Sequence, residues 1–169
     1  MKVKIFASAL LVLSCALTLM GKTIKADFTG KWNMDETQSE GISSGTKQIM
    51  TITQSGEQLI VDTKIYPSNG LAYSIKDSYM LNGKETVFHP EINGQEGTGK
   101  HTAKWLADGK SIEVSESVMF NTKQGSITAQ TKRKLIMSTD SKTVTIEATS
   151  KTPQGNISSK RVFIRQVLD

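Results

Sequence analysis

Three arginine side chains have the spacing most suggestive of chemistry in this sequence. Arg161 and Arg165 lie in an alternating apolar and polar stretch near the end of the chain, and Arg133 lies in an earlier stretch of the same kind. Alternate side chains of a β-strand point to one face, so Arg161 would share a face with Phe163 and Arg165. A guanidinium enclosed by apolar side chains suits a carboxylate, because its planar fork donates two parallel hydrogen bonds. We therefore expect Arg133 or Arg161 to contact an acidic head group, unless they pair with Glu116 or face water.

Aromatic and acidic side chains with the same alternation could line a cavity around these arginines. Tyr73 and Tyr79 fall on one face of a single stretch, and Trp105 shares a face with His101 on another. Ligand pockets are mostly apolar and contain a few polar groups, which this mixture provides. The candidate ligand-binding residues are Arg133, Arg161, Phe163, Tyr73, Tyr79, Trp105 and Glu116. The same side chains could equally fill a core, and both alternatives are open at this point.

The residue pattern does not indicate an enzyme or a metal site. A serine nucleophile would need an exposed nucleophile elbow, and we expect none here. His89 and His101 are the two histidines, and neither lies in a cluster of ligands at short spacing. The stretch Gly97–Lys100 lacks the spacing of a phosphate loop. We predict no enzymatic activity, no cofactor and no metal; a general acid–base pair of Glu116 and His101 is the least favoured hypothesis.

Short alternating runs rich in Thr, Val and Ile must position these residues. About ten such runs follow one another from Gly30 onward, separated by turn signals that include Asn82-Gly83 and Asp108-Gly109. None shows sustained helical spacing, although residues 35–47 could hold one loose helical turn. A flat sheet of ten strands would leave two edges exposed, and closure removes them. The predicted fold class is all-β, an up-and-down antiparallel meander of about 8–10 strands closed into a barrel, with a two-sheet sandwich as the alternative.

The opening segment FTGKW, residues 28–32, resembles the Gly-x-Trp start shared by lipocalins and fatty-acid-binding proteins, the calycin group. Gly30 and Trp32 match that motif. The resemblance implies a lipocalin-like β-barrel in which the Trp32 indole packs across the floor and a basic side chain of the last strand covers it. A guanidinium stacked on an indole tolerates partial burial. Gly30, Trp32 and Arg165 are therefore the predicted barrel-closing residues.

The resemblance has two departures. Residues 161–163 resemble the Arg-x-Tyr anion clamp of fatty-acid-binding proteins, but Phe163 lacks the hydroxyl. Those proteins insert two helices between their first two strands, whereas Glu36–Lys47 is too short for a two-helix lid. Residues 28–39 also resemble the start of uncharacterised bacterial exported lipocalin-like proteins.

The function implied by this resemblance is ligand binding. We expect an exported, monomeric barrel that binds a small apolar or amphipathic ligand. The alternative is an envelope structural or protein-interaction module with a filled barrel and no ligand. Such a module would act through its loops, above all Glu36–Lys47 and Glu91–Gly99.

The first 26 residues have the pattern of an export signal. Lys2 and Lys4 precede an apolar run over Ile5–Met20, and a short segment then ends at Ala26. The run is too short for a confident membrane span. We predict a signal peptide over residues 1–26, a single β-barrel domain over residues 27–169, and a secreted or periplasmic location. Alternatively, the VLSC segment is a lipoprotein box and the chain is anchored at Cys15.

Charge and cysteine content exclude several classes of partner. The chain has 21 Lys and Arg against 16 Asp and Glu, but four of the lysines belong to the predicted leader, which leaves 17 against 16. This balance does not favour nucleic acid or an anionic membrane surface. The basic segment Thr131–Lys134 is adequately explained as a solvated strand face. Cys15 is the single cysteine, so the domain after the leader would contain no disulfide and no thiolate metal site.

Overall fold

The computed structural model describes residues 24–92, 95–122 and 125–167, and the regular structure in these ranges is β-strand. No described segment forms a helix that could cross a bilayer. The predicted leader falls outside the described residues except for its last three positions. The strands are β1 (Gly30–Glu40), β2 (Lys47–Ser55), β3 (Gln58–Tyr66), β4 (Tyr73–Met80), β5 (Thr86–Phe88), β6 (Glu91–Ile92), β7 (Gln95–Trp105), β8 (Ser111–Thr122), β9 (Gly125–Met137), β10 (Thr143–Thr152) and β11 (Gly155–Arg165).

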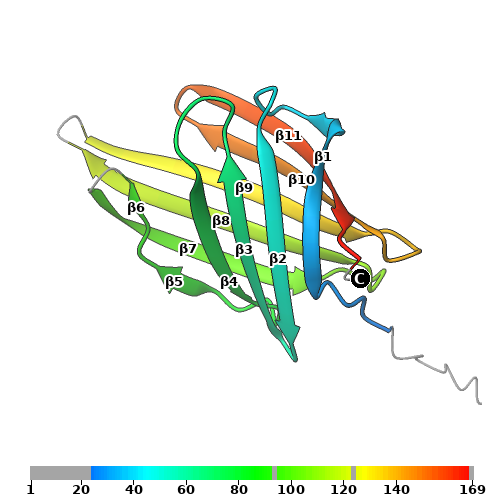
Figure 1. The fold of residues 1–169 in the computed structure, drawn as a ribbon. Helices are drawn as coiled ribbons and strands as arrows, with labels where there is room; N and C mark the ends of the chain where they lie inside the picture. Colours follow the sequence, from blue (N-terminus) through cyan, green and yellow to red (C-terminus); the bar gives the residue numbers. More distant parts are fainter. Residues whose placement is uncertain (1–23, 93–94, 123–124, 168–169) are drawn as a thin grey trace, which may run out of the picture.

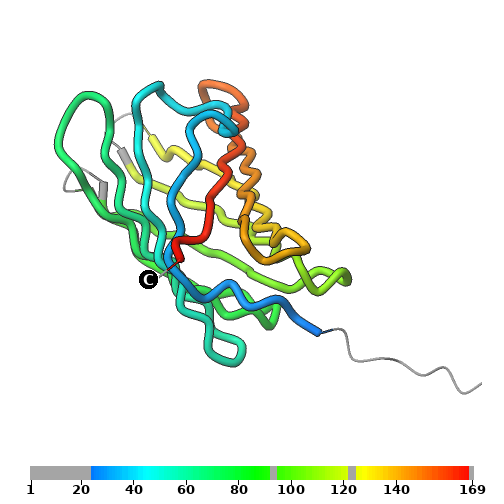
Figure 2. Tube along the Cα trace, turned by 45° about the vertical axis from the view of Figure 1, so that its right-hand side comes forward, coloured from blue at the N-terminus to red at the C-terminus, as the bar shows by residue number. Residues whose placement is uncertain are grey.

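The strands form one antiparallel sheet in the order β4-β3-β2-β1-β11-β10-β9-β8-β7-β5, and β6 pairs with β7 off this path. From β1 to β4 and from β7 to β11, strands that are consecutive in sequence are paired in the sheet, as expected for hairpins joined by short turns. The return of the last strand to the first completes the path, because β11 pairs with β1 in a register that sets Arg165 opposite Trp32. The first and last strands run side by side in the trace (Figures 1 and 2).

The sheet curls until β4 approaches β7 and forms a nearly closed barrel (Figure 1). A single bridge between Asn82 and Lys104 joins the two sides of the seam, supported by a 2.9 Å hydrogen bond from the Gly83 amide to the Ala103 carbonyl. Farther along the seam β7 pairs with the three-residue β5 instead of β4. The predicted fold class is confirmed, and closure leaves few of the exposed sheet edges that an open meander would carry.

The segment that follows the first strand differs from the prediction. The loose helical turn expected within residues 35–47 is wrong, because β1 continues to Glu40 and only residues 41–46 form the connection to β2. The pairing of β1 with β11 is irregular between Asp35 and Glu40. The Ser39 hydroxyl accepts a 3.0 Å hydrogen bond from the Val162 amide at this irregularity. A side chain thus supplies an acceptor to a backbone donor where the regular ladder is interrupted.

The hydrophobic core fills one end of the barrel, which we call the floor. Its side chains come from alternate positions of nearly every long strand, because the sheet presents one residue in two to the interior. The largest fully buried members are Trp32, Phe28, Phe163, Met50, Ile52, Leu59, Ile112, Val114 and Val144. Both described ends of the chain lie at the floor, while the β1–β2, β3–β4 and β10–β11 connections lie at the opposite end, which we call the mouth (Figure 1).

Candidate functional site

The three residues predicted to close the barrel meet at the floor. Trp32 is fully buried, and its indole Nε1 donates a 3.1 Å hydrogen bond to the Phe28 carbonyl. The Arg165 guanidinium lies 4.1 Å from the indole centroid and donates to the carbonyls of Thr29, Asp27 and Ser141 at 2.6, 3.1 and 2.9 Å. Backbone carbonyl oxygens thus accept hydrogen bonds from the guanidinium of Arg165, and its charge can therefore lie over the Trp32 ring without a carboxylate partner.

The conformation and surroundings of Gly30 explain why the Gly-x-Trp motif has a glycine at this position. Its φ of 147° is in the range that favours glycine, and a Cβ at this position would lie 2.9 Å from Nη1 of Arg165. A side chain would therefore displace the guanidinium from the Trp32 ring.

Between the core and the mouth the barrel interior is hollow. It contains two adjoining cavities, of about 400 Å³ on the side of β8 and about 530 Å³ toward the mouth. We call them together the inner cavity, because they share five lining residues, which are Gln48, Ile65, Ile75, Arg133 and Arg161. The part beside β8 is walled mainly by apolar side chains, among them Val118, Phe120 and Phe88. The volume is in the range of small-molecule sites.

Arg133 in the inner cavity is paired. Its Nη1 donates a 2.8 Å hydrogen bond to the Tyr79 hydroxyl and lies 4.0 Å from Oδ2 of Asp77, and its Nη2 lies 3.5 Å from Oε1 of Glu116. Burial lowers the pKa of Arg133, but the tyrosine and the two carboxylates together raise it. Burial also raises the pKa of the Tyr79 phenol well above its usual value of 10.0, so this hydroxyl is neutral. The positive charge of Arg133 is therefore largely compensated by the protein itself.

Arg161 lines the same cavity but has no carboxylate partner among the described residues. Its Nε is buried and makes no hydrogen bond within the described chain. Burial, and to a lesser degree the neighbouring charge of Arg133, lower the pKa of Arg161. A guanidinium nevertheless keeps its proton at neutral pH. The inner cavity thus holds one cation whose buried Nε has no hydrogen-bond partner among the described residues, next to a second cation whose charge is largely compensated.

The other predicted ligand-binding residues are distributed along the barrel. Tyr79 and Glu116 join Arg133 in the cavity wall, and Phe163 is buried where the wall meets the core. Tyr73 lines the cavity at the mouth and is 52% exposed. Trp105 lines neither part of the inner cavity; it packs against Phe28 at the floor, with ring centroids 5.9 Å apart. The parity of Trp105 is inward, as expected, but its position along the strand is too close to the floor.

Several polar residues of the cavity wall were not among the candidates, and two of them, Asp77 and Gln48, follow from the same alternation. Asp77 has the same parity as Tyr73 and Tyr79, so the alternation used for the tyrosines also points to it. Gln48 is 6% exposed and alternates with the buried Met50, which is the signal of an inward polar side chain.

The geometry gives little support to an acid–base pair. His101 lies opposite Glu116 in the sheet, but its Nε2 is buried without a hydrogen-bond partner among the described residues. Glu116 is directed to Arg133 instead. No group of three or more His, Cys, Asp or Glu side chains in the described ranges could hold a metal ion.

One expectation about the sequence needs correction. Residues 41–45 read Gly-Ile-Ser-Ser-Gly and therefore do carry the letters of the Gly-x-Ser-x-Gly motif. They lie in the loop between two antiparallel strands and are followed by β2, not by the helix that a nucleophile elbow requires. The Ser44 hydroxyl lies 3.5 Å from a carboxylate oxygen of Glu36, and neither Ser43 nor Ser44 meets an imidazole among the described residues.

Comparisons with known proteins place the fold. No protein-family model matches the sequence, and no curated protein matches it significantly. Among solved structures, the chain is similar to the zebrafish ileal bile acid-binding protein, determined as a complex with cholic acid. The two chains share 15% sequence identity and superpose with a TM-score of 0.51, over 82% of this chain and 98% of that one. At this identity the likeness concerns the fold alone. The chain has a calycin-like all-β fold, and the resemblance drawn from FTGKW is confirmed at that level.

Proposed function

We propose that this protein binds one small amphipathic ligand with an anionic head group in its inner cavity. The observation that carries the proposal is Arg161, a half-buried cation that lines a partly apolar cavity and has no carboxylate partner among the described residues. An unpaired buried charge is costly, and an anion from the ligand would remove that cost. The calycin-like fold supports the same conclusion, since a similar barrel was determined with cholic acid, itself an amphipathic acid.

The position of the polar groups suggests how the ligand lies. Arg133 and Arg161 border both parts of the inner cavity, whereas Val118, Phe120 and Phe88 wall the part beside β8. The head group would therefore lie between the arginines and the tail along β8. The filled-barrel alternative is less favoured, because the cavity is too large to be an ordinary packing defect.

Calorimetric titration with oleate, cholate and the uncharged methyl oleate tests the proposal. Arg161→Met should weaken binding of the acids at least tenfold and leave methyl oleate nearly unchanged. Lys160→Met is the matched control, because it removes a charge from the same strand but from an exposed position. Failure of the wild-type protein to bind any of these ligands saturably, together with native mass spectra that show it ligand-free when purified from its own host, would refute the proposal.

We also propose that the protein is exported, as residues 1–26 suggest, and that it acts as a monomer outside the cytoplasm. The proposal is supported by the basic, apolar and short polar order of those residues.

A further inference from the structure

The outer face of the sheet carries one row in which lysines and glutamates alternate from strand to strand. We call it the charge ladder, and its members in order across β7, β8, β9, β10, β11 and β1 are Lys104, Glu113, Lys134, Glu147, Lys160 and Glu40. Each member lies directly opposite a residue of the other sign, and the Nζ of Lys104 is 3.2 Å from Oε1 of Glu113. Opposite charges in cross-strand pairs stabilise a sheet and keep its face soluble. This row needs no partner outside the chain.

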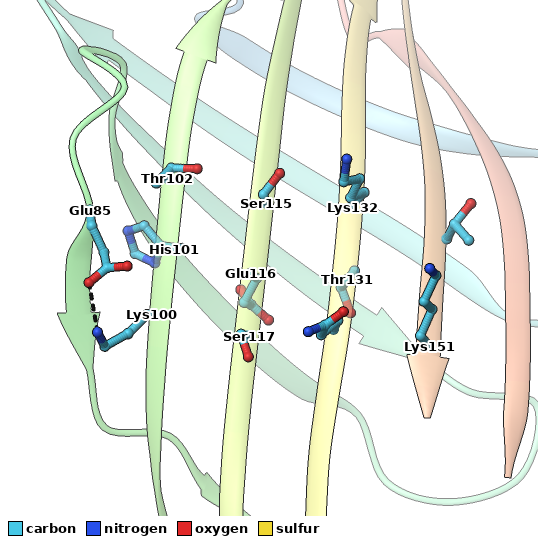
Figure 3. Close-up of a pocket in the computed structure, with 12 residues that line it drawn as sticks. Glu85, Lys100, His101, Thr102, Ser115, Glu116, Ser117, Thr131, Lys132 and Lys151 are labelled. Carbon is cyan, nitrogen blue, oxygen red and sulfur yellow. Dashed lines mark hydrogen bonds and ion pairs between the residues drawn. The ribbon is translucent and has the colours of Figure 1, made fainter. Parts of the chain in front are cut away.

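The two rows nearer the mouth lack this alternation of lysine and glutamate. They consist of lysines, hydroxyls and one amide: Thr102, Ser115, Lys132 and Thr149 in the first, and Lys100, Ser117, Gln130 and Lys151 in the second. These eight residues, which we call the lysine–hydroxyl groove, line an external concavity of about 470 Å³ on β7 to β10 (Figure 3).

The cations of the groove are only partly compensated. Glu85, from the segment before β5, bonds the Nζ of Lys100 at 2.8 Å (Figure 3). Lys132 and Lys151 form no ion pair with a described carboxylate. Their direct cross-strand neighbours are Ser115 and Thr149 for Lys132, and Gln130 and Asn156 for Lys151, and none of these bears a charge. The concavity is lined by three lysines against Glu85 and Glu116, and the carboxylate of Glu116 faces Arg133, so the groove has net positive charge, whereas the adjacent charge ladder is neutral.

The dimensions of the groove indicate an elongated ligand. Lys100 and Lys151 lie three strand spacings apart, about 14 Å, and Lys132 lies between them on the neighbouring row. Hydroxyl and amide groups occupy the positions between the lysines, so hydrogen-bonding partners are available along the whole width. The groove rows contain no aromatic side chain, which disfavours stacking of nucleic-acid bases, and no large apolar side chain that could insert into a bilayer.

We propose that the lysine–hydroxyl groove binds an acidic polysaccharide. Carboxylate or sulfate groups of the glycan would pair with Lys132 and Lys151, and its hydroxyls would exchange hydrogen bonds with Ser115, Ser117, Gln130 and Thr149. The eight groove residues belong to the outer face of the sheet, whereas the ligand proposed above lies inside the barrel; Glu116 and Thr131 border both spaces.

The test is binding to immobilised polygalacturonate and to heparin, with uncharged dextran as the reference. The variant Lys132→Gln/Lys151→Gln should lose at least tenfold in affinity for the acidic glycans. The matched control is Lys134→Gln/Lys160→Gln, which removes the same charge from the charge ladder and should change the affinity less than twofold. Both pairs are on the outer face, and thermal unfolding of each variant checks that the fold is retained.

Three results would overturn the proposal. The first is equal loss in the two double variants, which would indicate general electrostatic attraction. The second is wild-type binding to polygalacturonate and heparin no stronger than to dextran. The third is tighter binding to single-stranded DNA or to phosphatidylglycerol vesicles with the same dependence on Lys132 and Lys151, which would assign the groove to another class of partner.

Discussion

At the scale of single residues, the barrel floor depends on one cation that is satisfied by backbone carbonyls. Arg165 makes three hydrogen bonds and covers Trp32, whereas the Nε of Arg161, four residues earlier on the same face, has no hydrogen-bond partner in the described ranges. Two identical side chains on one strand face therefore differ in their partners: Arg165 is bonded to backbone carbonyls, and Arg161 is the one to which we assign the proposed ligand.

Removal of the Arg165 guanidinium should destabilise the fold. Arg165→Met loses three charge-assisted hydrogen bonds and the cation–π contact, and we expect the free energy of unfolding to fall by about 2–3 kcal/mol. Urea denaturation followed by tryptophan fluorescence measures this change. Arg165→Lys should recover only part of it, because an ammonium cannot reproduce the planar fork. A change within about 0.5 kcal/mol for Arg165→Met would contradict the assigned role.

The Tyr79 phenol should make stability sensitive to alkaline pH. Its pKa in the folded protein is raised, first by burial and further by Asp77 and Glu116, although Arg133 lowers it. The unfolded chain loses this proton near pH 10, so the stabilisation is complete below pH 10 and falls as the pH rises above it. We expect the wild type to lose up to about 1.4 kcal/mol per pH unit more than Tyr79→Phe between pH 10 and 11. Unfolding free energies with the same dependence on pH in both proteins would contradict this prediction.

At the scale of elements, the rows of residues that run across the strands differ in the charges of their cross-strand neighbours. Lys134 lies between Glu113 and Glu147, while Lys132, two residues earlier on the same strand, lies between Ser115 and Thr149. The alternation of charge belongs to a row across strands and is invisible along any one strand.

Charge reversal at Lys134 and at Lys132 should change the free energy of unfolding by different amounts in the two rows. Lys134→Glu places three carboxylates side by side and should lower the free energy of unfolding by about 1 kcal/mol at low salt. Lys132→Glu meets no like charge in its row and should have a much smaller effect. Urea unfolding at low salt and in 1 M NaCl measures both, and the difference should shrink in high salt, where exposed charges are screened. Equal costs for the two variants would show that the ladder contributes nothing.

The seam of the barrel also depends on close packing between two glycines of β7 and two aromatic rings on neighbouring strands. A Cβ on Gly99 would lie 2.4 Å from the Phe88 ring, and one on Gly97 would lie 2.6 Å from the Phe120 ring. Because Gly97 and Gly99 have no side chains, β7 has room for two aromatic rings that line the inner cavity. The short β5 is held against β7 in this way, although it has only three residue pairs.

At the scale of the whole molecule, the barrel is packed at the floor and hollow toward the mouth. The segment before β1 takes part in the floor: the Ala26 amide donates a 2.8 Å hydrogen bond to the Gly109 carbonyl, and the Lys25 ammonium lies 5.5 Å from the Trp105 ring centroid. The folded unit thus begins slightly before the predicted cleavage position.

Removal of a leader after Ala26 should leave a folded but slightly weaker barrel. A chain that starts at Asp27 keeps Phe28 and Trp32 in the core but loses the Ala26 hydrogen bond. We expect it to be about 1 kcal/mol less stable than a chain that starts at Ile24. Urea unfolding of the two chains measures this. The intact mass of the protein recovered from its own host identifies the first residue, and a lipid-modified Cys15 would contradict cleavage after Ala26.

Local chemistry along the chain was enough to predict the strands and the hairpin order, and the resemblance of FTGKW to the calycin group favoured a barrel over a sandwich. Alternation and Asn-Gly or Asp-Gly turns act over a few residues and can therefore be recognised in the sequence, whereas the contact of Arg165 with Trp32 was implied by the resemblance to the calycin group. Parity likewise indicated that Arg133, Arg161 and Glu116 face inward. Residues 35–40 were harder, because their strand is irregular and depends on Ser39 meeting a strand more than a hundred residues away.

Only the tertiary structure decided which of these residues act together. Parity states which face a side chain occupies, but the height of that side chain in the barrel and its cross-strand neighbours depend on register between distant strands. Register set Arg133 beside Tyr79 and Glu116, and it left Arg161 without a carboxylate partner in the described part of the chain. Register also placed Trp105 at the floor and separated the charge ladder from the lysine–hydroxyl groove. Pairing over long sequence separations is a property of the closed sheet, and a strand read by itself does not contain it.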